Sequence, residues 1–220
     1  MNPTPDALVI AVAGGFGREL AAYARDSGFE VGAFLHDVSR SPIDGIDLGA
    51  EVRGPAEEYE PVGEELVAVG LGDPGPRREL ADHLIARGAR LATVVHPTAW
   101  VAPTAHLGQG VVIAPFAFVG PGARIDDLSV LNTYASVGHD SVVGRCCVLS
   151  PYAVIGGWAR LEDEAYLATH AVVTPRKTVG AGSSVSAGSV VFRDVPAASL
   201  AMGNPARSRA LYATPTGAGR

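Results

Sequence analysis

The chain has 220 residues, and 47% of them are hydrophobic, which is enough to bury the cores of two domains. Its formal net charge of −6 argues against a nucleic-acid-binding protein, which would need a basic surface. It has no apolar run of roughly 18 residues that would span a membrane, and the start of the chain lacks a signal-peptide pattern. The only cysteines, Cys146 and Cys147, are adjacent and are expected to be reduced. We therefore expect a cytoplasmic protein that binds neither nucleic acid nor membrane.

Apolar runs and helical patterns alternate along the first part of the chain. The sequence predicts strands at 7–15, 31–37, 65–72 and 90–97, helices at 18–28 and 73–88, and a loop-rich segment at 38–65. Such alternation is typical of a small parallel sheet with covering helices. Residues 1–94 are therefore predicted to form a Rossmann-like α/β domain.

A glycine-rich turn joins the first predicted strand to the first helix. Its sequence, GGFGR, begins at Gly14. Glycines in such a turn allow a ligand to approach closely, and the N–H groups that start a helix favour anions. Asp37 follows Gly17 by 20 residues, a spacing at which a carboxylate can bind a ribose hydroxyl. The turn predicts a nucleotide site, with a plain glycine turn as the alternative.

A repeat of six residues begins at Val95. Every sixth residue from Val95 to Val191 is Val, Ile or Leu, which makes 17 consecutive positions. A helix does not use this period, because six steps of about 100° scatter the side chains around its axis. Hexapeptide repeats are typical of parallel β-helices. Residues 95–220 are therefore predicted to form an all-β parallel β-helix with a C-terminal tail.

These repeats resemble those of the left-handed parallel β-helix acyltransferases, in which three hexads form one triangular coil. The segments AVAGGFGREL, FLHD, GDPGPRREL and GNPAR resemble the NeuD/PglD-like branch, and the resemblance covers roughly residues 7–210. Members of this branch are bacterial enzymes that use acetyl-CoA to acetylate nucleotide-linked amino sugars or sialic acids. The resemblance implies roughly five left-handed coils, a homotrimer, and an acyl-CoA and a sugar as substrates, without a metal.

The segment SVGHDSVVG places His139 and Asp140 inside the repeat. His139 holds the third position of its hexad, near a corner, whereas the first and fifth positions point inward. Acyl transfer to an amine or hydroxyl needs a base, and histidine suits this task because free imidazole titrates near neutral pH. The resemblance makes His139 the base, Asp140 its supporting acid, and Asn132 a further active-site residue. The alternative is a solvated corner.

Gly157 follows His139 by 18 residues and should lie directly above it, one coil further on. We expect its N–H to stabilise the charge that develops on the thioester oxygen, with a tight corner at Gly156 and Gly157 as the alternative. By resemblance, coenzyme A lies on the C-terminal coils at Ala168, Ala187, Gly188 and Pro205, with Lys177, Arg193 and Arg207 as nearby cations. The acceptor is expected at Gly14, Gly15, Phe16, Gly17, Asp37 and Arg77.

Three positions depart from the family pattern. Phe16 replaces the histidine of a common Gly-His-Gly motif, and Val148 replaces a second histidine nine residues after the base. His170 stands where the family usually has a small residue near the coenzyme arm. These departures concern the acceptor and the coenzyme, and they leave the predicted fold unchanged.

The leading hypothesis is an acetyl-CoA-dependent N-acetyltransferase that acts on a nucleotide-linked amino sugar. Alternatives within the enzyme class are O-acetylation of a sialic-acid-like sugar and transfer of another acyl group. A γ-type carbonic anhydrase shares the β-helix but needs a histidine where this chain has Gly144. A non-catalytic trimeric scaffold that binds nucleotides is the alternative of another class.

Overall fold

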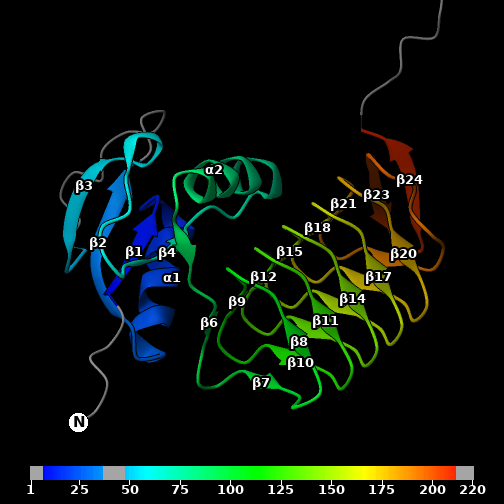
Figure 1. Cartoon of the computed structure of the whole chain (residues 1–220). Helices are drawn as coiled ribbons and strands as arrows, with labels where there is room; N and C mark the ends of the chain where they lie inside the picture. Colours follow the sequence, from blue (N-terminus) through cyan, green and yellow to red (C-terminus); the bar gives the residue numbers. More distant parts are fainter. Residues whose placement is uncertain (1–6, 37–47, 212–220) are drawn as a thin grey trace, which may run out of the picture.

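The computed structural model describes residues 7–36 and 48–211. A small parallel sheet with two helices precedes a long stack of short strands (Figure 1). Within the described residues, no helix is long and apolar enough to cross a membrane.

The N-terminal sheet contains five parallel strands. They are β1 (Ala7–Ala11), β2 (Glu30–His36), β3 (Glu51–Pro55), β4 (Leu66–Val69) and β5 (Arg90–Leu91). Helix α1 (Gly15–Asp26) follows β1, the short 3-10 helix η1 (Ala56–Glu58) follows β3, and helix α2 (Pro74–Ala86) follows β4. The strand order is β3-β2-β1-β4-β5, so the connections after β1 and β4 leave in opposite directions. Ligands bind at this point in folds of this type.

Two sequence predictions for this region are wrong in detail. The segment predicted as loop contains β3, a sheet-edge strand whose mostly exposed side chains lack the apolar alternation that would have marked it. The strand predicted at 90–97 is two strands, because β5 joins the N-terminal sheet and β6 (Val94–Val95) begins the first coil. The chain therefore passes between its two architectures inside one apolar run.

The stack contains seventeen two-residue strands, β6 to β22, arranged as three faces. The first face holds β7 (Trp100–Val101), β10 (Phe118–Val119), β13 (Ser136–Val137), β16 (Val154–Ile155), β19 (Val172–Val173) and β22 (Val190–Val191). The second face holds β8 (His106–Leu107), β11 (Arg124–Ile125), β14 (Val142–Val143), β17 (Arg160–Leu161) and β20 (Thr178–Val179). The third face holds β6, β9 (Val112–Ile113), β12 (Val130–Leu131), β15 (Val148–Leu149), β18 (Tyr166–Leu167), β21 (Ser184–Val185), β23 (Ser199–Gly203) and β24 (Ala206–Ala210).

The hexad repeat accounts for this stack. Each strand pairs in parallel with the strand 18 residues later, as Val119 does with Val137. The second residue of each strand points inward, and from Ile113 to Val191 these residues are buried in one continuous core. A residue with left-handed φ recurs at the corners every six residues from Gly110 to Gly188. Most of these corner residues are not glycine, so the corners carry outward side chains in three vertical columns.

We name the three corners by their content. The aromatic corner joins the third face to the first and comprises residues 114–117, 132–135, 150–153 and 168–171. The base corner joins the first face to the second and comprises residues 120–123, 138–141, 156–159 and 174–177. The packed corner joins the second face to the third and comprises residues 126–129, 144–147, 162–165 and 180–183.

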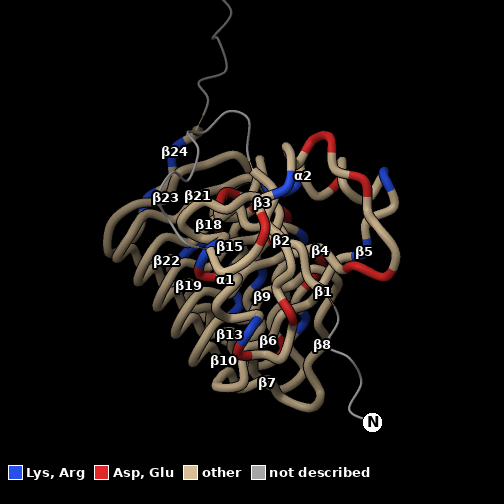
Figure 2. The backbone as a smooth tube through the Cα atoms, turned by 90° about the vertical axis from the view of Figure 1, so that its left-hand side faces the viewer, with Lys and Arg blue, Asp and Glu red and all other residues tan. Residues whose placement is uncertain are grey.

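The N-terminal sheet and helices cover the third face and the packed corner. Val94, Val112 and Val130, which point outward from the third face, are buried in one cluster with Leu8 and Leu20. Figure 2 shows that charged residues gather on the N-terminal part and where it meets the coils, whereas the coil edge at β19 and β22 is almost free of them. The first face and the aromatic corner therefore remain uncovered.

Arg77 is a structural residue at this junction, and the prediction that it binds the acceptor is wrong. Its side chain is fully buried, and its guanidinium donates hydrogen bonds to the carbonyl oxygens of Val69, Leu71, Gly110 and Leu128. Burial lowers the pKa of Arg77 to about 10. All of its partners belong to the chain, so no part of this cation faces a ligand.

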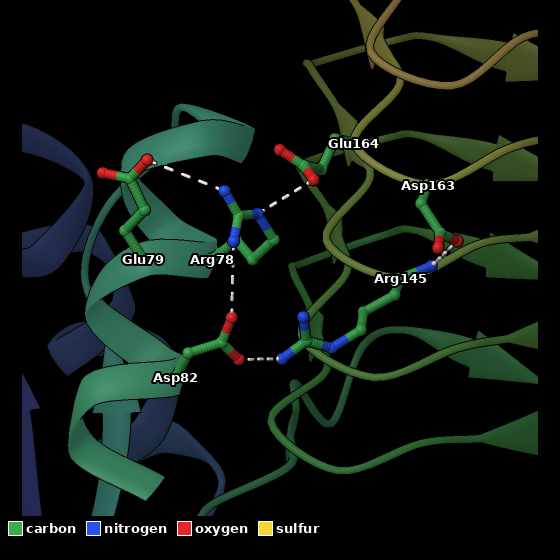
Figure 3. Close-up of polar contacts among 6 residues, drawn as sticks. All are labelled: Arg78, Glu79, Asp82, Arg145, Asp163 and Glu164. Carbon is green, nitrogen blue, oxygen red and sulfur yellow. Dashed lines mark hydrogen bonds and ion pairs between the residues drawn. The ribbon is translucent and has the colours of Figure 1, made fainter. Parts of the chain in front are cut away.

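Ion pairs add a polar contact between α2 and the packed corner (Figure 3). Arg78 Nε lies 2.9 Å from Glu164 Oε1, and Arg145 pairs with Asp82 of α2. Arg78 also lies 3.5 Å from Asp82, so two arginines share this carboxylate. The network holds the N-terminal part in a defined orientation on the coils.

Candidate active site

His139 and Asp140 form a hydrogen-bonded pair at the base corner, between β13 and β14. His139 Nδ1 lies 2.9 Å from Asp140 Oδ2, and about half of each side chain is exposed. Asp140 has a φ of 56°, and this turn brings its carboxylate back beside the imidazole. A neutral imidazole that donates from Nδ1 keeps Nε2 as a proton acceptor. The pair therefore has the arrangement of a general base with an orienting acid.

Gly157 lies directly above His139, as the 18-residue step predicts. A Cβ built on Gly157 would lie 2.5 Å from His139 Nε2, so only glycine fits there. Gly157 is buried, and its N–H donates no hydrogen bond to any residue in the described ranges. Because buried N–H groups are nearly always paired, this one suits a ligand atom beside Nε2.

Two side chains that the sequence patterns did not single out complete the base corner. The Trp158 ring lies edge-on to His139, with 4.4 Å between ring centroids and an interplanar angle of 84°. Arg176 Cζ lies 4.7 Å from the centroid of the Trp158 ring. Both residues follow Asp140 at 18-residue steps, so the coil period was a signal that could have found them.

Asn132 does not join this group. It lies on the aromatic corner, one corner before His139, because seven residues carry the chain across the first face. Its Oδ1 accepts a hydrogen bond from the Thr133 N–H at 2.7 Å. The structure thus brings together His139, Asp140 and Gly157 and separates Asn132 from them.

The residues predicted to contact coenzyme A lie towards the end of the stack. Ala187 and Gly188 are exposed on the continuation of the aromatic corner, and Ala168 lies one coil below them, partly buried. Pro205 is exposed in the turn between β23 and β24. A Cβ on Gly188 would have no atom within 4 Å, so this corner is open at its upper end.

His170 belongs to a column of stacked rings on the aromatic corner. Phe116, Tyr134, Tyr152 and His170 follow one another at 18-residue steps, with centroids 5.0, 4.8 and 4.8 Å apart. The interplanar angles are 16°, 3° and 4°. The column ends at His170, because the next residue in the series is Gly188.

The predicted cations occupy different places near the end of the stack. Lys177 lies on the base corner beside Arg176 and is partly buried. Arg193 and Arg207 are exposed and line one cavity of about 340 Å³. These two arginines therefore lie together at the C-terminal end of the coils.

The turn after β1 offers backbone N–H groups to an anion. Gly14 precedes α1 without any side-chain cap, and Gly15 is exposed. Gly17, in contrast, is buried, and a Cβ there would lie 2.0 Å from the Val12 carbonyl oxygen. Close packing of α1 on the sheet is therefore sufficient to explain this glycine. The predicted ribose ligand, Asp37, lies outside the described residues.

A cavity of about 700 Å³ lies where the turn after β4 meets the third face. Its lining includes Gly72, Asp73, Glu164, Tyr166 and Ser184. A Cβ on Gly72 would lie 3.9 Å from the Phe16 side chain, so the turn after β1 adjoins this cavity. Pro74 and Pro76 remove N–H donors from the start of α2. Asp73 and Glu164 further disfavour an anion there, in contrast to the start of α1.

No side-chain group in the described part of the chain is arranged to hold a metal. Residues 7–36 and 48–211 contain no cluster of three or more His, Cys, Asp or Glu side chains placed for this purpose. His96, at the start of the first coil, is buried and contacts Asp26 and Thr98 instead.

Comparison with known proteins places this geometry in a family. A family described as the GMPPB C-terminal domain matches residues 90–195, and no curated protein sequence matches the chain. Perosamine N-acetyltransferase from Caulobacter crescentus, solved as a His-to-Asn variant with CoA and GDP-perosamine, is 30% identical with a TM-score of 0.86, and the match covers 94% of this chain and 98% of that one. The acetyltransferase domain of PglB from Neisseria gonorrhoeae FA1090 is 30% identical with a TM-score of 0.84, covering 92% and 99%.

WeeI from Acinetobacter baumannii AYE is a third similar structure, at 25% identity and a TM-score of 0.81, covering 92% of this chain and 99% of that one. These matches extend over nearly the full length of both partners and include the N-terminal sheet as well as the coils. They confirm the family that the hexads, GGFGR and GNPAR indicated. The chain belongs to the NeuD/PglD-like family of hexapeptide-repeat sugar acetyltransferases, which are acetyl-CoA-dependent acyltransferases.

Proposed function

We propose that this protein transfers the acetyl group of acetyl-CoA to the amino group of a nucleotide-linked amino sugar, with His139 as the general base. The observation that carries this proposal is the base corner, where Asp140 orients the imidazole and Nε2 faces Gly157. Two similar structures of the Caulobacter crescentus enzyme contain CoA and GDP-perosamine, and a PglB acetyltransferase domain contains acetyl-CoA. These ligands support the same two substrate classes here.

The reaction follows from the positions of three groups. The amine nitrogen attacks the thioester carbonyl carbon while His139 Nε2 accepts a proton from the amine. The negative charge that develops on the carbonyl oxygen is stabilised by the unpaired Gly157 N–H. The carbon–sulfur bond then breaks, and the proton held on Nε2 passes to the departing thiolate to give CoA and the amide. Asp140 stabilises the imidazolium between these two steps.

The acceptor is expected to bind at the N-terminal part. Its diphosphate suits the N–H groups of Gly15 and Phe16 at the start of α1. Its nucleoside suits the adjoining cavity, where the acidic Asp73 can accept hydrogen bonds from a base or a ribose. Phe16 lies between the two places, so the aromatic ring replaces the family histidine where the acceptor bends towards the coils.

The acceptor site and the base lie on different sides of one chain. The cavity opens over the third face at β18 and β21, whereas His139 lies at the corner between the first and second faces. We therefore propose a homotrimer in which the cavity of one copy faces the base corner of the next. The same arrangement would bring Asn132 and the predicted coenzyme contacts of one copy to His139 of its neighbour.

The uncovered first face supports this assembly. Trp100 and Phe118 point outward from it with 50% and 40% of their surface exposed, and Val154 and Val172 continue the same outward column. Large exposed apolar areas on soluble proteins usually mark contact surfaces. We also propose that the coils are left-handed, as in the resembling acyltransferases. A cytoplasmic location is proposed as well, because the cysteines are free thiols and an acyl-CoA is the donor.

The proposal is tested by assaying the protein with acetyl-CoA and GDP-, UDP- and dTDP-linked amino sugars, with His139→Ala beside it. We expect one class of nucleotide-linked amino sugar to be acetylated on nitrogen, and His139→Ala to lower kcat by about 10²- to 10⁴-fold. His106→Ala is the matched control, because His106 is also an exposed coil histidine but lies on the second face. Near-normal turnover by His139→Ala would refute the base assignment.

The same assay separates the alternative reactions. Acetylation of a sialic-acid-like hydroxyl with no amine product would establish the O-acetyltransferase instead. A preference for a longer acyl-CoA over acetyl-CoA would change the donor and keep the mechanism. Sedimentation of the purified chain as a monomer under assay conditions would contradict the proposed trimer.

A further inference from the structure

The base corner carries a cation that the reaction scheme above does not use. Arg176 is exposed two coils above Asp140, and its guanidinium lies over the Trp158 ring. It forms no ion pair with any carboxylate in the described part of the chain. Asp194, the next residue of the column, instead accepts the Thr178 N–H at 3.0 Å. A charge that is placed beside a base and left unpaired is available to a substrate.

Trp158 holds this cation at a fixed distance from the base. Arg176 lies over the Trp158 ring, and His139 lies against it edge-on, so the ring spaces two groups instead of offering a free surface. The backbone fixes the same order, because the Trp158 N–H donates to the His139 carbonyl at 3.0 Å and the Arg176 N–H to the Gly157 carbonyl at 3.1 Å. Contacts of 4.4 Å and 4.7 Å therefore separate imidazole, indole and guanidinium.

This separation matches the size of a charged sugar. If the attacking nitrogen of a hexose lies at His139 Nε2, a phosphate on the far side of the ring lies about one sugar ring away. Arg176 lies at that range on the same corner. A guanidinium binds phosphate oxygens through two parallel N–H groups, and stacking on an aromatic ring leaves those groups free at its edge.

The diphosphate of coenzyme A is a poorer match. The thioester must lie beside the Gly157 N–H, and Arg176 is in the very next coil, about 4.8 Å further along the stack. The long pantetheine arm separates the sulfur of coenzyme A from its diphosphate by much more than this. The acceptor phosphate, in contrast, follows the reacting sugar directly.

We propose that Trp158 and Arg176 form an anion-binding shelf that recognises the sugar-proximal phosphate of the acceptor and so selects nucleotide-linked amino sugars over free ones. This inference rests on the proposed function and names a specificity residue within it. Arg176 is the contact residue. Trp158 positions it relative to His139.

The test compares wild type, Arg176→Gln and Arg176→Lys with two probes, GDP-perosamine and the methyl glycoside of the same amino sugar, which lacks the diphosphate. Arg176→Gln should raise the KM for GDP-perosamine about tenfold, which corresponds to about 1.4 kcal/mol. It should leave the KM for acetyl-CoA and for the methyl glycoside within about twofold. Arg176→Lys keeps the charge and should show a smaller rise. Arg160→Gln, an exposed arginine of the second face, is the matched control.

Three outcomes would overturn the shelf. They are an equal rise in KM for both acceptors, a rise in the KM for acetyl-CoA instead, or no change at all. If wild type acetylates no nucleotide sugar, the proposed function fails, and the shelf is then judged by calorimetry with GDP. Weaker GDP binding by Arg176→Gln than by wild type and Arg160→Gln would still support the shelf, and equal binding would refute it.

Discussion

The aromatic corner and the base corner have the same backbone and different contents. Both repeat every 18 residues, and both place a left-handed residue at the same point of each turn. On the aromatic corner that point holds Phe116, Tyr134, Tyr152 and His170, which stack as near-parallel rings. On the base corner it holds Asp140, Trp158 and Arg176, which differ at every step.

The contrast indicates where a repetitive fold carries its chemistry. Like residues at successive coils meet one another and satisfy their own contacts, as the stacked rings do. Unlike residues leave groups that the column itself does not satisfy, here the His139 Nε2, the Gly157 N–H and the Arg176 guanidinium. We therefore expect substitutions on the base corner to change turnover and those on the aromatic corner to change stability.

The largest effect that breaks this contrast should come from Gly157→Ala. The added Cβ would lie 2.5 Å from His139 Nε2 and would displace the imidazole. We expect kcat to fall by about 10²- to 10³-fold, the size seen when an oxyanion donor is lost. Steady-state kinetics measures the loss. In a His139→Ala background the same substitution should add little, and full additivity would show that the two residues act separately.

Asp140→Asn should have the next largest effect. The amide is the same size as the carboxylate, but it carries no charge to stabilise the imidazolium, and its NH₂ group cannot accept the Nδ1 proton. Because the pair is half exposed, we expect a loss in kcat of about tenfold to hundredfold, less than in buried triads. A melting temperature equal to wild type would place the loss in catalysis. Unchanged kcat would show that Asp140 does not orient the base.

Residues whose environment repeats were predictable from the sequence, and those whose environment is unique were not. The inward Val, Ile and Leu side chains follow from a period that each hexad restates. The contact between His139 and Gly157 follows from the same 18-residue step. Counting by hexads also places Asn132 on another corner, although the family resemblance grouped it with His139.

Arg77 and β3 show why the remaining features escaped. Arg77 binds carbonyl oxygens from two parts of the chain that no local pattern relates, so a charged helix residue appeared exposed. Strand β3 lies at a sheet edge with exposed side chains and has no apolar signature. The shelf of Trp158 and Arg176 depends on how two long side chains fold over each other, which spacing alone does not specify.

On the aromatic corner, Phe116→Ala should lower stability and leave turnover unchanged. The ring is 53% exposed and stacks on Tyr134 with centroids 5.0 Å apart. Losing one stacking partner should lower the free energy of unfolding by about 1 kcal/mol. Urea unfolding and steady-state kinetics measure the two effects. A fall in kcat with no change in stability would remove the distinction between the two corners.

The packed corner extends the comparison to the smallest expected effect. Cys146 has the same φ of 56° as Asp140 but lies buried beneath the N-terminal part. Burial raises the pKa of the Cys146 thiol to about 11 and that of Cys147 to about 12, from an ordinary value of 9.0. An unfolded chain therefore loses these protons first as the pH rises. Their contribution to stability is complete below about pH 9 and is lost as the pH rises towards 12.

Urea unfolding at pH 8, 9.5 and 10.5 measures this dependence for wild type and for the double variant Cys146→Ala and Cys147→Ala. The double variant should be less stable at pH 8, because two core side chains are shortened, but its stability should fall less steeply with pH. Other groups titrate equally in both proteins, so the difference between the two slopes isolates the thiols. Equal slopes would show that the packed corner admits water to these thiols, as the base corner does to Asp140.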